Sequence, residues 1–193
     1  MSSKLVLGVG FNSGKYPATK DGKILKVYNL WHNLICRCYH PRTPTERPTY
    51  VGCSISEKFK DFSFFHEWCL TQIGFGQEGY QLDKDLLLKG NKVYSEDTCV
   101  FLPRDLNSLL LSSKAARGSL PLGVSAVGNR FRVHCGRKPA NRFVGDFKTP
   151  EEAFQAYKQV KEAFIKSQAE KWKGQIDIRA YEALMCYEVL PTD

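Results

Sequence analysis

The spacing of hydrophobic positions in the first half of the chain predicts two core helices. Residues 26–39 carry apolar side chains at helical intervals, and these are Val27, Leu30, Trp31, Leu34, Ile35 and Cys38. A second stripe predicts a helix that begins near Asp61 or Ser63, and it comprises Phe59, Phe62, Phe65, Trp68 and Cys69. Residues 1–23 are rich in glycine and lack helical periodicity, so we expect a loop with one short strand. The segment 40–48, HPRTPTERP, is rich in proline and is expected to be a loop that is not helical.

Shorter apolar segments follow in the middle of the chain. Residues 74–79, GFGQEG, predict a turn, and residues 80–88 have the character of a strand. Cys99 to Leu102 are expected to be extended, after which Pro103 opens a short helix to about Leu111. Residues 112–119, SSKAARGS, are small, polar and basic, which is typical of a linker.

Beyond the linker the pattern changes to that of a small sheet followed by one long helix. The runs LGVSAV, RFRVHC and RFVGDF are separated by turn residues and predict three strands. Thr149, Pro150 and Glu152 form a helix-start signal, and the helix is expected to run to about Trp172. Its predicted buried stripe comprises Phe154, Tyr157, Val160, Phe164 and Ile165. Residues 176–193 are expected to form a short amphipathic appendage, with Ala180, Leu184 and Tyr187.

Positive charge is concentrated in two blocks of the 193-residue chain. The whole chain carries +8, but residues 1–50 carry +6 and residues 112–148 carry +7, while the other two segments are mildly acidic. These blocks favour a polyanionic partner, because each phosphate that a basic group neutralises releases a counterion. The alternative is a solvated basic surface that serves solubility. We favour nucleic acid as the partner, and strand alternation places Arg130 and Arg132 on one face.

Composition argues against several other classes of protein. No apolar run approaches the ~20 residues of a membrane span. The N-terminus lacks the apolar core and cleavage site of a signal peptide. The seven cysteines are scattered and odd in number, which does not fit a disulfide framework. We therefore expect a cytoplasmic monomer with no membrane partner and no small-molecule cofactor.

Four segments in the last third of the chain resemble the DNA-binding domain of plant ethylene-response factors, the AP-two domain. They are LGVS (122–125), RFRV (130–133), VGDF (144–147) and residues 149–166. The strand tryptophans of that family are absent here. The resemblance implies a three-stranded sheet in the major groove, with basic side chains on bases and phosphates. The DNA-binding residues expected in this region are Lys114, Arg117, Arg130, Arg132, Arg137, Lys138, Arg142 and Lys148.

The chain as a whole resembles phage-type HNH homing endonucleases that carry this same C-terminal domain. The matching segments are WHNLICRCY (31–39), YVGCSIS (50–56), residues 80–107 and YEALMCYEV (181–189). The resemblance implies a β-hairpin followed by a helix around one divalent cation, Mg²⁺ or another. In such a site a histidine activates water, and an asparagine in the hairpin loop orients the histidine.

The same resemblance assigns roles to individual residues. Asp83 stands at the metal-binding position, Lys84 at the position of the catalytic histidine and Asn91 at that of the hairpin asparagine. The second metal ligand would be one of Ser95, Asp97 and Asn107. Lysine is a poor general base unless its pKa is lowered, so His66 is an alternative base if its helix abuts the hairpin.

The segment LDKD, residues 82–85, also allows two other interpretations. Asp83 and Asp85 lie two apart in the expected strand and would point the same way, which suits Mg²⁺. With Lys89, and with Glu67 from the helix, they resemble the carboxylate–lysine sites of restriction-type nucleases. The structural alternative is a charged strand edge.

A structural Zn²⁺ is a further expectation for this loop-rich half. Its ligands would be Cys38, His40, Cys53 and Cys99. No pair of cysteines has the CxxC spacing, and the competing interpretation is that the cysteines are buried as small hydrophobic side chains.

Pattern, charge and resemblance together predict an α+β protein. Its expected parts are an HNH-like nuclease module (1–111), a basic linker (112–119), a DNA-binding domain of a three-stranded antiparallel sheet packed on one helix (120–175) and a helical appendage (176–193). The expected function is a metal-dependent endonuclease that cuts or nicks double-stranded DNA at a long, tolerant site, in the cytoplasm of a phage-infected bacterium. The alternative is a DNA-binding regulator whose nuclease site has decayed.

Overall fold

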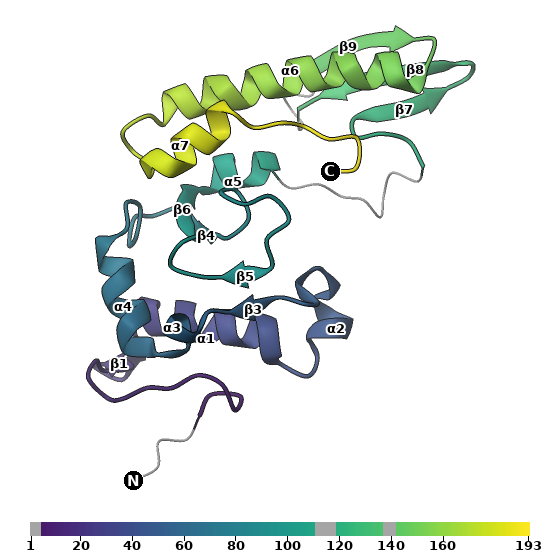
Figure 1. Ribbon diagram of the computed structural model, residues 1–193. Coiled ribbons are helices and arrows are strands. Elements are labelled where there is room, and N and C mark those ends of the chain that lie inside the picture. Colours follow the sequence, from purple (N-terminus) through teal and green to yellow (C-terminus); the bar gives the residue numbers. More distant parts are fainter. Residues whose placement is uncertain (1–4, 111–118, 137–141) are drawn as a thin grey trace. The chain divides into compact units, whose positions relative to one another are not determined.

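The computed structural model describes residues 5–110, 119–136 and 142–193 and shows a mixed α+β protein (Figure 1). The chain divides into two compact units. The first comprises Met1–Pro103 with Gln175–Ala180, and the second comprises Arg104–Gly174 with Tyr181–Asp193. This boundary lies at Pro103, earlier in the chain than the expected boundary at residue 111. Within the described ranges, no helix has the length and apolar character needed to cross a membrane.

Helices supply most of the core of the first unit. They are α1 (Lys26–Tyr39), α2 (Thr43–Glu46), α3 (Glu57–Lys60), α4 (Phe62–Thr71) and the 3-10 turn η1 (Pro48–Tyr50). The predicted helix 26–39 is confirmed, and so is the start of α4, where the Asp61 carboxylate accepts a hydrogen bond from the Ser63 backbone N–H. The largest side chains of the shared core are fully buried: Trp31, Phe59, Phe62 and Phe65.

The expectation that residues 40–48 are not helical is wrong. Residues Thr43–Glu46 form one helical turn, and η1 follows directly. Pro44 and Pro48 lie in the first turn of α2 and of η1, where a backbone N–H has no helical partner to lose. The Thr43 hydroxyl donates to the Cys36 carbonyl, which ties this segment to the end of α1.

Short strands complete the first unit. β1 (Thr19–Lys20) pairs with β2 (Lys23–Ile24), and β3 (Ser54–Ile55) runs parallel to β5 (Val93–Tyr94). β4 (Tyr80–Asp83) is antiparallel to β6 (Val100–Pro103), with Asp83 opposite Val100. The long segment between β4 and β6 therefore leaves from Asp83 and returns beside it, which makes residues 84–99 a closed loop.

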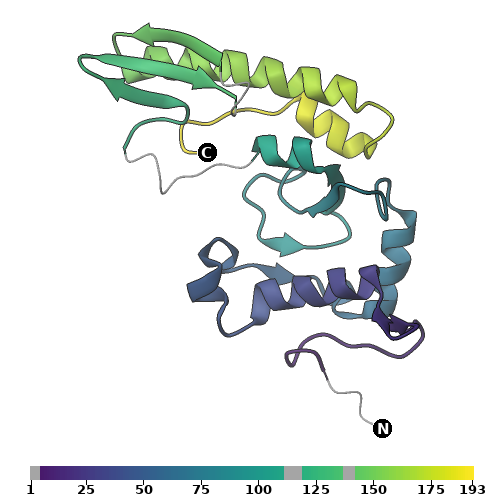
Figure 2. The same ribbon diagram turned by 180° about the vertical axis from the view of Figure 1, so that it is seen from behind.

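The second unit contains a three-stranded antiparallel sheet with α6 along one face (Figures 1 and 2). Its strands are β7 (Val124–Val127), β8 (Arg130–Cys135) and β9 (Arg142–Phe147), with β8 in the centre. The helices are α5 (Arg104–Leu110), α6 (Pro150–Lys171) and part of α7 (Ile178–Met185). The predicted cap of α6 is confirmed, because the Glu152 N–H donates to Thr149 Oγ1.

The buried stripe of α6 matches its prediction at three of five positions. Phe154, Tyr157 and Ile165 are buried as expected, but Val160 is half-buried and Phe164 is 40% exposed. Ala153 and Ala169 are also buried. α6 packs against all three strands, and Val133 in the central strand is fully buried.

We predict that Gly123→Ala destabilises the second unit by about 2–4 kcal/mol. Gly123 has a φ of +78°, and a Cβ there would lie 2.1 Å from a ring carbon of Tyr157. The control is Gly128→Ala, since Gly128 also has a positive φ but a Cβ at that position would have no atom within 4 Å. Thermal unfolding of both variants separates the clash from the backbone strain. Equal losses would contradict the assigned role of Tyr157.

Candidate functional site

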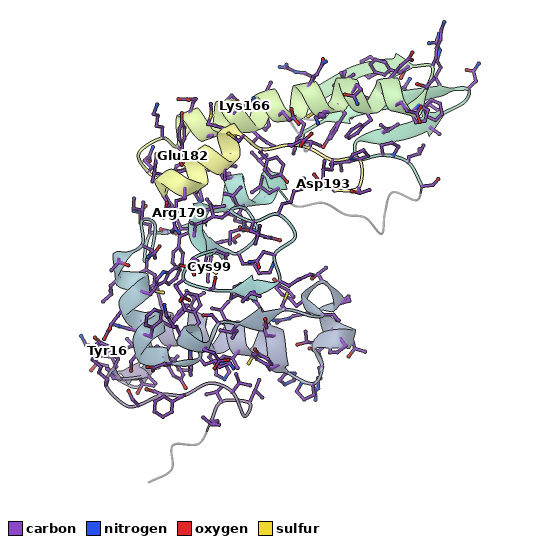
Figure 3. The ribbon with its side chains drawn as sticks, viewed as in Figure 1. Tyr16, Cys99, Lys166, Arg179, Glu182 and Asp193 are labelled. Carbon is purple, nitrogen blue, oxygen red and sulfur yellow. The ribbon has the colours of Figure 1, made fainter. Side chains whose placement is uncertain are left out.

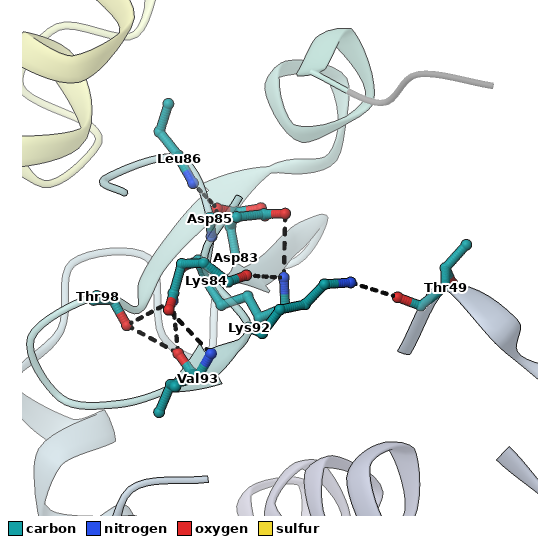
Figure 4. Close-up of polar contacts among 9 residues, drawn as sticks. Thr49, Asp83, Lys84, Asp85, Leu86, Lys92, Val93 and Thr98 are labelled. Carbon is teal, nitrogen blue, oxygen red and sulfur yellow. Dashed lines mark hydrogen bonds and ion pairs between the residues drawn. The ribbon is translucent and has the colours of Figure 1, made fainter. Parts of the chain in front are cut away.

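The closed loop 84–99 begins with a turn made by the Asp83 side chain. Its Oδ1 accepts hydrogen bonds from the backbone N–H groups of Asp85 (3.0 Å) and Leu86 (2.8 Å) (Figure 4). β4 therefore ends at Asp83, and the predicted strand to Leu88 is too long. Asp85 lies in the turn that follows β4. The turn therefore brings the two carboxylates close together, and strand alternation does not.

Asn91 holds the two sides of the loop together. Its Nδ2 donates to the carbonyls of Lys84 (2.7 Å) and Val93 (2.7 Å), and its Oδ1 accepts from the Val93 N–H (3.0 Å). The Thr98 hydroxyl is a further contact at 3.2 Å. Asn91 thus fixes the backbone of Lys84. The resemblance puts Lys84 at the position of the histidine that the hairpin asparagine orients.

Lys84 is the buried cation of the loop. The residue is 9% exposed, and its Nζ donates to the Asn91 carbonyl (2.9 Å) and pairs with Asp85 Oδ2 (3.1 Å). The ring of Tyr94 lies 5.8 Å from the ammonium group. These contacts use Lys84 as a hydrogen-bond donor that ties the turn to the far side of the loop.

The Asp83 carboxyl has a strongly perturbed pKa. Burial raises the pKa of Asp83 to about 6, and the nearby Asp85 carboxylate adds to the rise, while the two backbone N–H groups oppose it. A half-buried carboxylate beside a second carboxylate is destabilised as an anion, and a cation bound to both would relieve the repulsion.

We predict that Asp83→Asn stabilises the protein in EDTA at pH 7.5 by up to about 3 kcal/mol. A raised carboxyl pKa means that the folded state holds the proton more tightly, so native stability falls as the pH rises from about 4 through about 6. Asparagine keeps the Oδ1 acceptor for both backbone N–H groups and removes the charge.

Urea denaturation at pH 4 and pH 7.5 checks this prediction. The gain over the unchanged protein should be present at pH 7.5 and absent at pH 4. Glu78→Gln, which neutralises an exposed carboxylate in the turn before β4, is the control and should show no such difference. A gain that does not depend on pH would contradict the electrostatic cause.

His66 lies elsewhere in the first unit. Its ring stacks on Tyr16 at 4.1 Å and contacts the edge of Phe62. Tyr16 lies well apart from Cys99 (Figure 3), whereas the Asp83 charge contributes to the raised pKa of the Cys99 thiol. The structure therefore does not bring His66 to the Asp83 carboxylate.

Two other expected members of the site have different surroundings. The Glu67 carboxylate is paired with Lys15 and accepts a hydrogen bond from the Tyr16 hydroxyl. Asn107 lies on α5, in the second unit, so its role as a metal ligand stays a prediction. Across residues 5–110, 119–136 and 142–193, no three His, Cys, Asp or Glu side chains form a group that could hold a metal.

Among the expected zinc ligands, Cys53 and Cys99 are buried and Cys38 is half-buried. Burial raises the pKa of the Cys38 thiol to about 12, and nearby Cys53 adds to it. Cys99, with a pKa also raised by burial, lies close to Cys69 and to Asp83. His40 Nδ1 accepts a hydrogen bond from the Arg42 N–H. The structural Zn²⁺ stays a prediction, which elemental analysis of protein purified without chelator would test.

The sheet of the second unit exposes basic side chains on the face opposite α6. Arg130, Arg132 and His134 alternate with the inward residues of β8, of which Val133 and Cys135 are buried. Arg142 pairs in register with Cys135, so it does not share the face of Arg130 and Arg132. Lys148 is exposed just after β9. Lys114, Arg117, Arg137 and Lys138 lie outside the described residues.

Two features of this face were not anticipated. Asp146 forms an ion pair with Arg132, and Phe143 is 54% exposed beside it. Asp146 is the one acidic residue among the eight basic residues of the block 112–148. This was the only feature of the sequence that could have drawn attention to it. Its partner depends on strand register, which the sequence did not reveal.

Comparison of the chain with protein-family models, with curated proteins and with solved structures gave no match.

Proposed function

We propose that the chain is a DNA-binding protein that hydrolyses phosphodiester bonds with a divalent cation at Asp83 and Asp85, as a free-standing homing endonuclease would. The observation that carries this proposal is the pair of neighbouring carboxylates of Asp83 and Asp85, and the pKa of Asp83 is raised to about 6. Both lie at the start of the loop 84–99, whose two sides Asn91 joins by hydrogen bonds. The resemblance to HNH endonucleases, whose site lies between a hairpin and a helix, supports it, since β4, the loop, β6 and α5 follow in that order.

The donor set at this turn fits Mg²⁺. Magnesium is commonly bound by one or two carboxylates and keeps several waters and substrate phosphates as its other ligands. Asp83 and Asp85 would be the protein ligands. When bound, the cation supplies charge neutralisation at the phosphate and at the leaving oxygen.

The chain's own residues position these ligands. The backbone N–H groups of Asp85 and Leu86 fix one oxygen of the Asp83 carboxylate, Oδ1, in the turn. Lys84 orients Asp85 through their ion pair, and Asn91 keeps the loop backbone in place. A site that is organised before the substrate arrives loses less entropy on binding.

DNA binding is assigned to the open sheet face. A sheet of this size fits the major groove, and Arg130 and Arg132 project from the central strand toward the solvent. Lys148 extends the positive charge beyond β9. Binding through these groups should weaken steeply with salt.

The alternative function is a DNA-binding regulator without cleavage. The position of Lys84 favours this alternative, because its ammonium group is buried and donates to the Asn91 carbonyl and to Asp85. A donor engaged in this way is not placed to accept a proton from water.

Supercoiled phage DNA incubated with the full chain, with Mg²⁺ or with EDTA, decides between the two functions. The endonuclease predicts conversion to nicked or linear DNA with Mg²⁺ and none with EDTA. A mobility shift without conversion under both conditions would establish the regulator instead.

A further inference from the structure

Arg132 occupies the centre of the open sheet face. It lies in the middle strand, with Ser125 of β7 and Asp146 of β9 opposite it in register. Its neighbour Val133 is fully buried on the side of α6, so Arg132 projects from the other side. A ligand lying across all three strands would therefore meet this side chain.

The Arg132 guanidinium is fixed by two partners from β9. Its Nε donates to Asp146 Oδ1 and its Nη2 donates to Asp146 Oδ2, both at 2.8 Å. The guanidinium carbon lies 5.6 Å from the centre of the Phe143 ring. A bidentate ion pair of this kind fixes the plane of the guanidinium group as well as its position.

This side-on pair leaves the far edge of the guanidinium group unused by Asp146. Arginine has five N–H donors, and the pair engages one on Nε and one on Nη2. An N–H on Nη1 and the second N–H on Nη2 remain parallel at the outer edge. Guanine presents two acceptors, N7 and O6, to the major groove in the matching geometry.

We propose that Asp146 is a positioning residue, which orients Arg132 for bidentate recognition of one guanine in the major groove. The inference rests on the proposed DNA binding and adds the base that is read. A carboxylate in a basic patch repels phosphates, so it lowers affinity for DNA in general. Asp146 is explained if the orientation of the Arg132 guanidinium group matters more than its charge. Bidentate recognition of a base edge requires that the plane of the guanidinium group be fixed, whereas contact with a phosphate does not.

The experiment uses the full chain in EDTA and a library of randomised DNA duplexes. Bound duplexes are selected and sequenced for the unchanged protein and for Asp146→Asn, Arg132→Lys and Arg130→Ala. The unchanged protein should enrich one guanine position. Asp146→Asn and Arg132→Lys should each lower that preference about tenfold, since both lose the oriented fork.

Total affinity separates positioning from simple attraction. Asp146→Asn should bind the unselected library at least as tightly as the unchanged protein does, because it removes a negative charge. Arg130→Ala is the matched control on the same strand face, and it should weaken binding to all duplexes while it keeps the guanine preference. Thermal unfolding confirms that each variant is folded.

The possible failures are distinguishable. An unchanged guanine preference in Asp146→Asn, or binding of the unchanged protein with no preference for any base, overturns the positioning role. Failure of the unchanged protein to bind any duplex overturns the proposed DNA binding itself.

Discussion

Asp83→Asn should abolish Mg²⁺-dependent cleavage of DNA while it leaves the fold intact. The substitution removes one of two carboxylates that would hold the cation, yet it preserves the Oδ1 acceptor for the N–H groups of Asp85 and Leu86. Because a bound metal supplies several kcal/mol of transition-state stabilisation, the cleavage rate should fall at least about a hundredfold.

The rate of conversion of supercoiled to nicked DNA measures this effect. Fluorescence anisotropy with a labelled duplex should show unchanged binding, since the basic sheet face belongs to the other unit. Glu78→Gln, at an exposed carboxylate before β4, is the matched control and should cut normally. Undiminished cutting by Asp83→Asn would place the metal elsewhere.

The same variant should be more stable and less active, a trade-off that marks a functional site. In EDTA it escapes the repulsion between two neighbouring carboxylates, which burial makes costly at neutral pH. Natural chains retain such strained charges where activity requires them.

Trp31→Ala should destabilise the first unit by about 3–5 kcal/mol. Trp31 is fully buried, and its indole N–H donates to the Phe59 carbonyl at 2.8 Å. Its ring also lies 5.3 Å from that of Phe62 and 5.5 Å from that of Tyr28. Truncation leaves a cavity among these rings and an unpaired carbonyl, and each adds to the loss.

Urea denaturation followed by circular dichroism measures the loss. Leu70→Ala is the control, because Leu70 is an apolar residue on α4 that is 63% exposed. That variant should change the free energy of unfolding by less than about 1 kcal/mol. A loss below about 1 kcal/mol for Trp31→Ala would show that this core does not depend on the indole ring.

The C-terminal segment affects how the two units should be tested. Gln175–Ala180 belong to the first unit, where the Tyr80 hydroxyl donates to the Gln175 carbonyl and Arg179 donates to the Asp97 carbonyl. A truncation after the predicted linker would remove these contacts from the loop that contains Thr98 and its bond to Asn91. Point substitutions in the full chain therefore test cleavage and recognition more cleanly.

The two longest helices, α1 and α6, and the caps of α4 and α6 were determined by the sequence alone. The period of apolar residues in 26–39 and 149–172 is a local property, and so are the caps at Asp61 and Thr149. The alternation along β8 likewise placed Arg130 and Arg132 on one face. Each of these features depends on residues that are close together in the sequence, so the pattern of residue types predicts it.

Only the tertiary structure decided where the candidate chemistry lies. β4 ends at Asp83 because that carboxylate binds two backbone N–H groups of the following turn, and strand character alone predicted five more residues. Lys84 is buried where the loop brings back Asn91, whose carbonyl accepts a hydrogen bond from the Lys84 ammonium group. Asp146 meets Arg132 because β8 and β9 pair in one register. These contacts depend on particular side chains in a turn, on loop closure and on strand register, and no hydrophobic period encodes them.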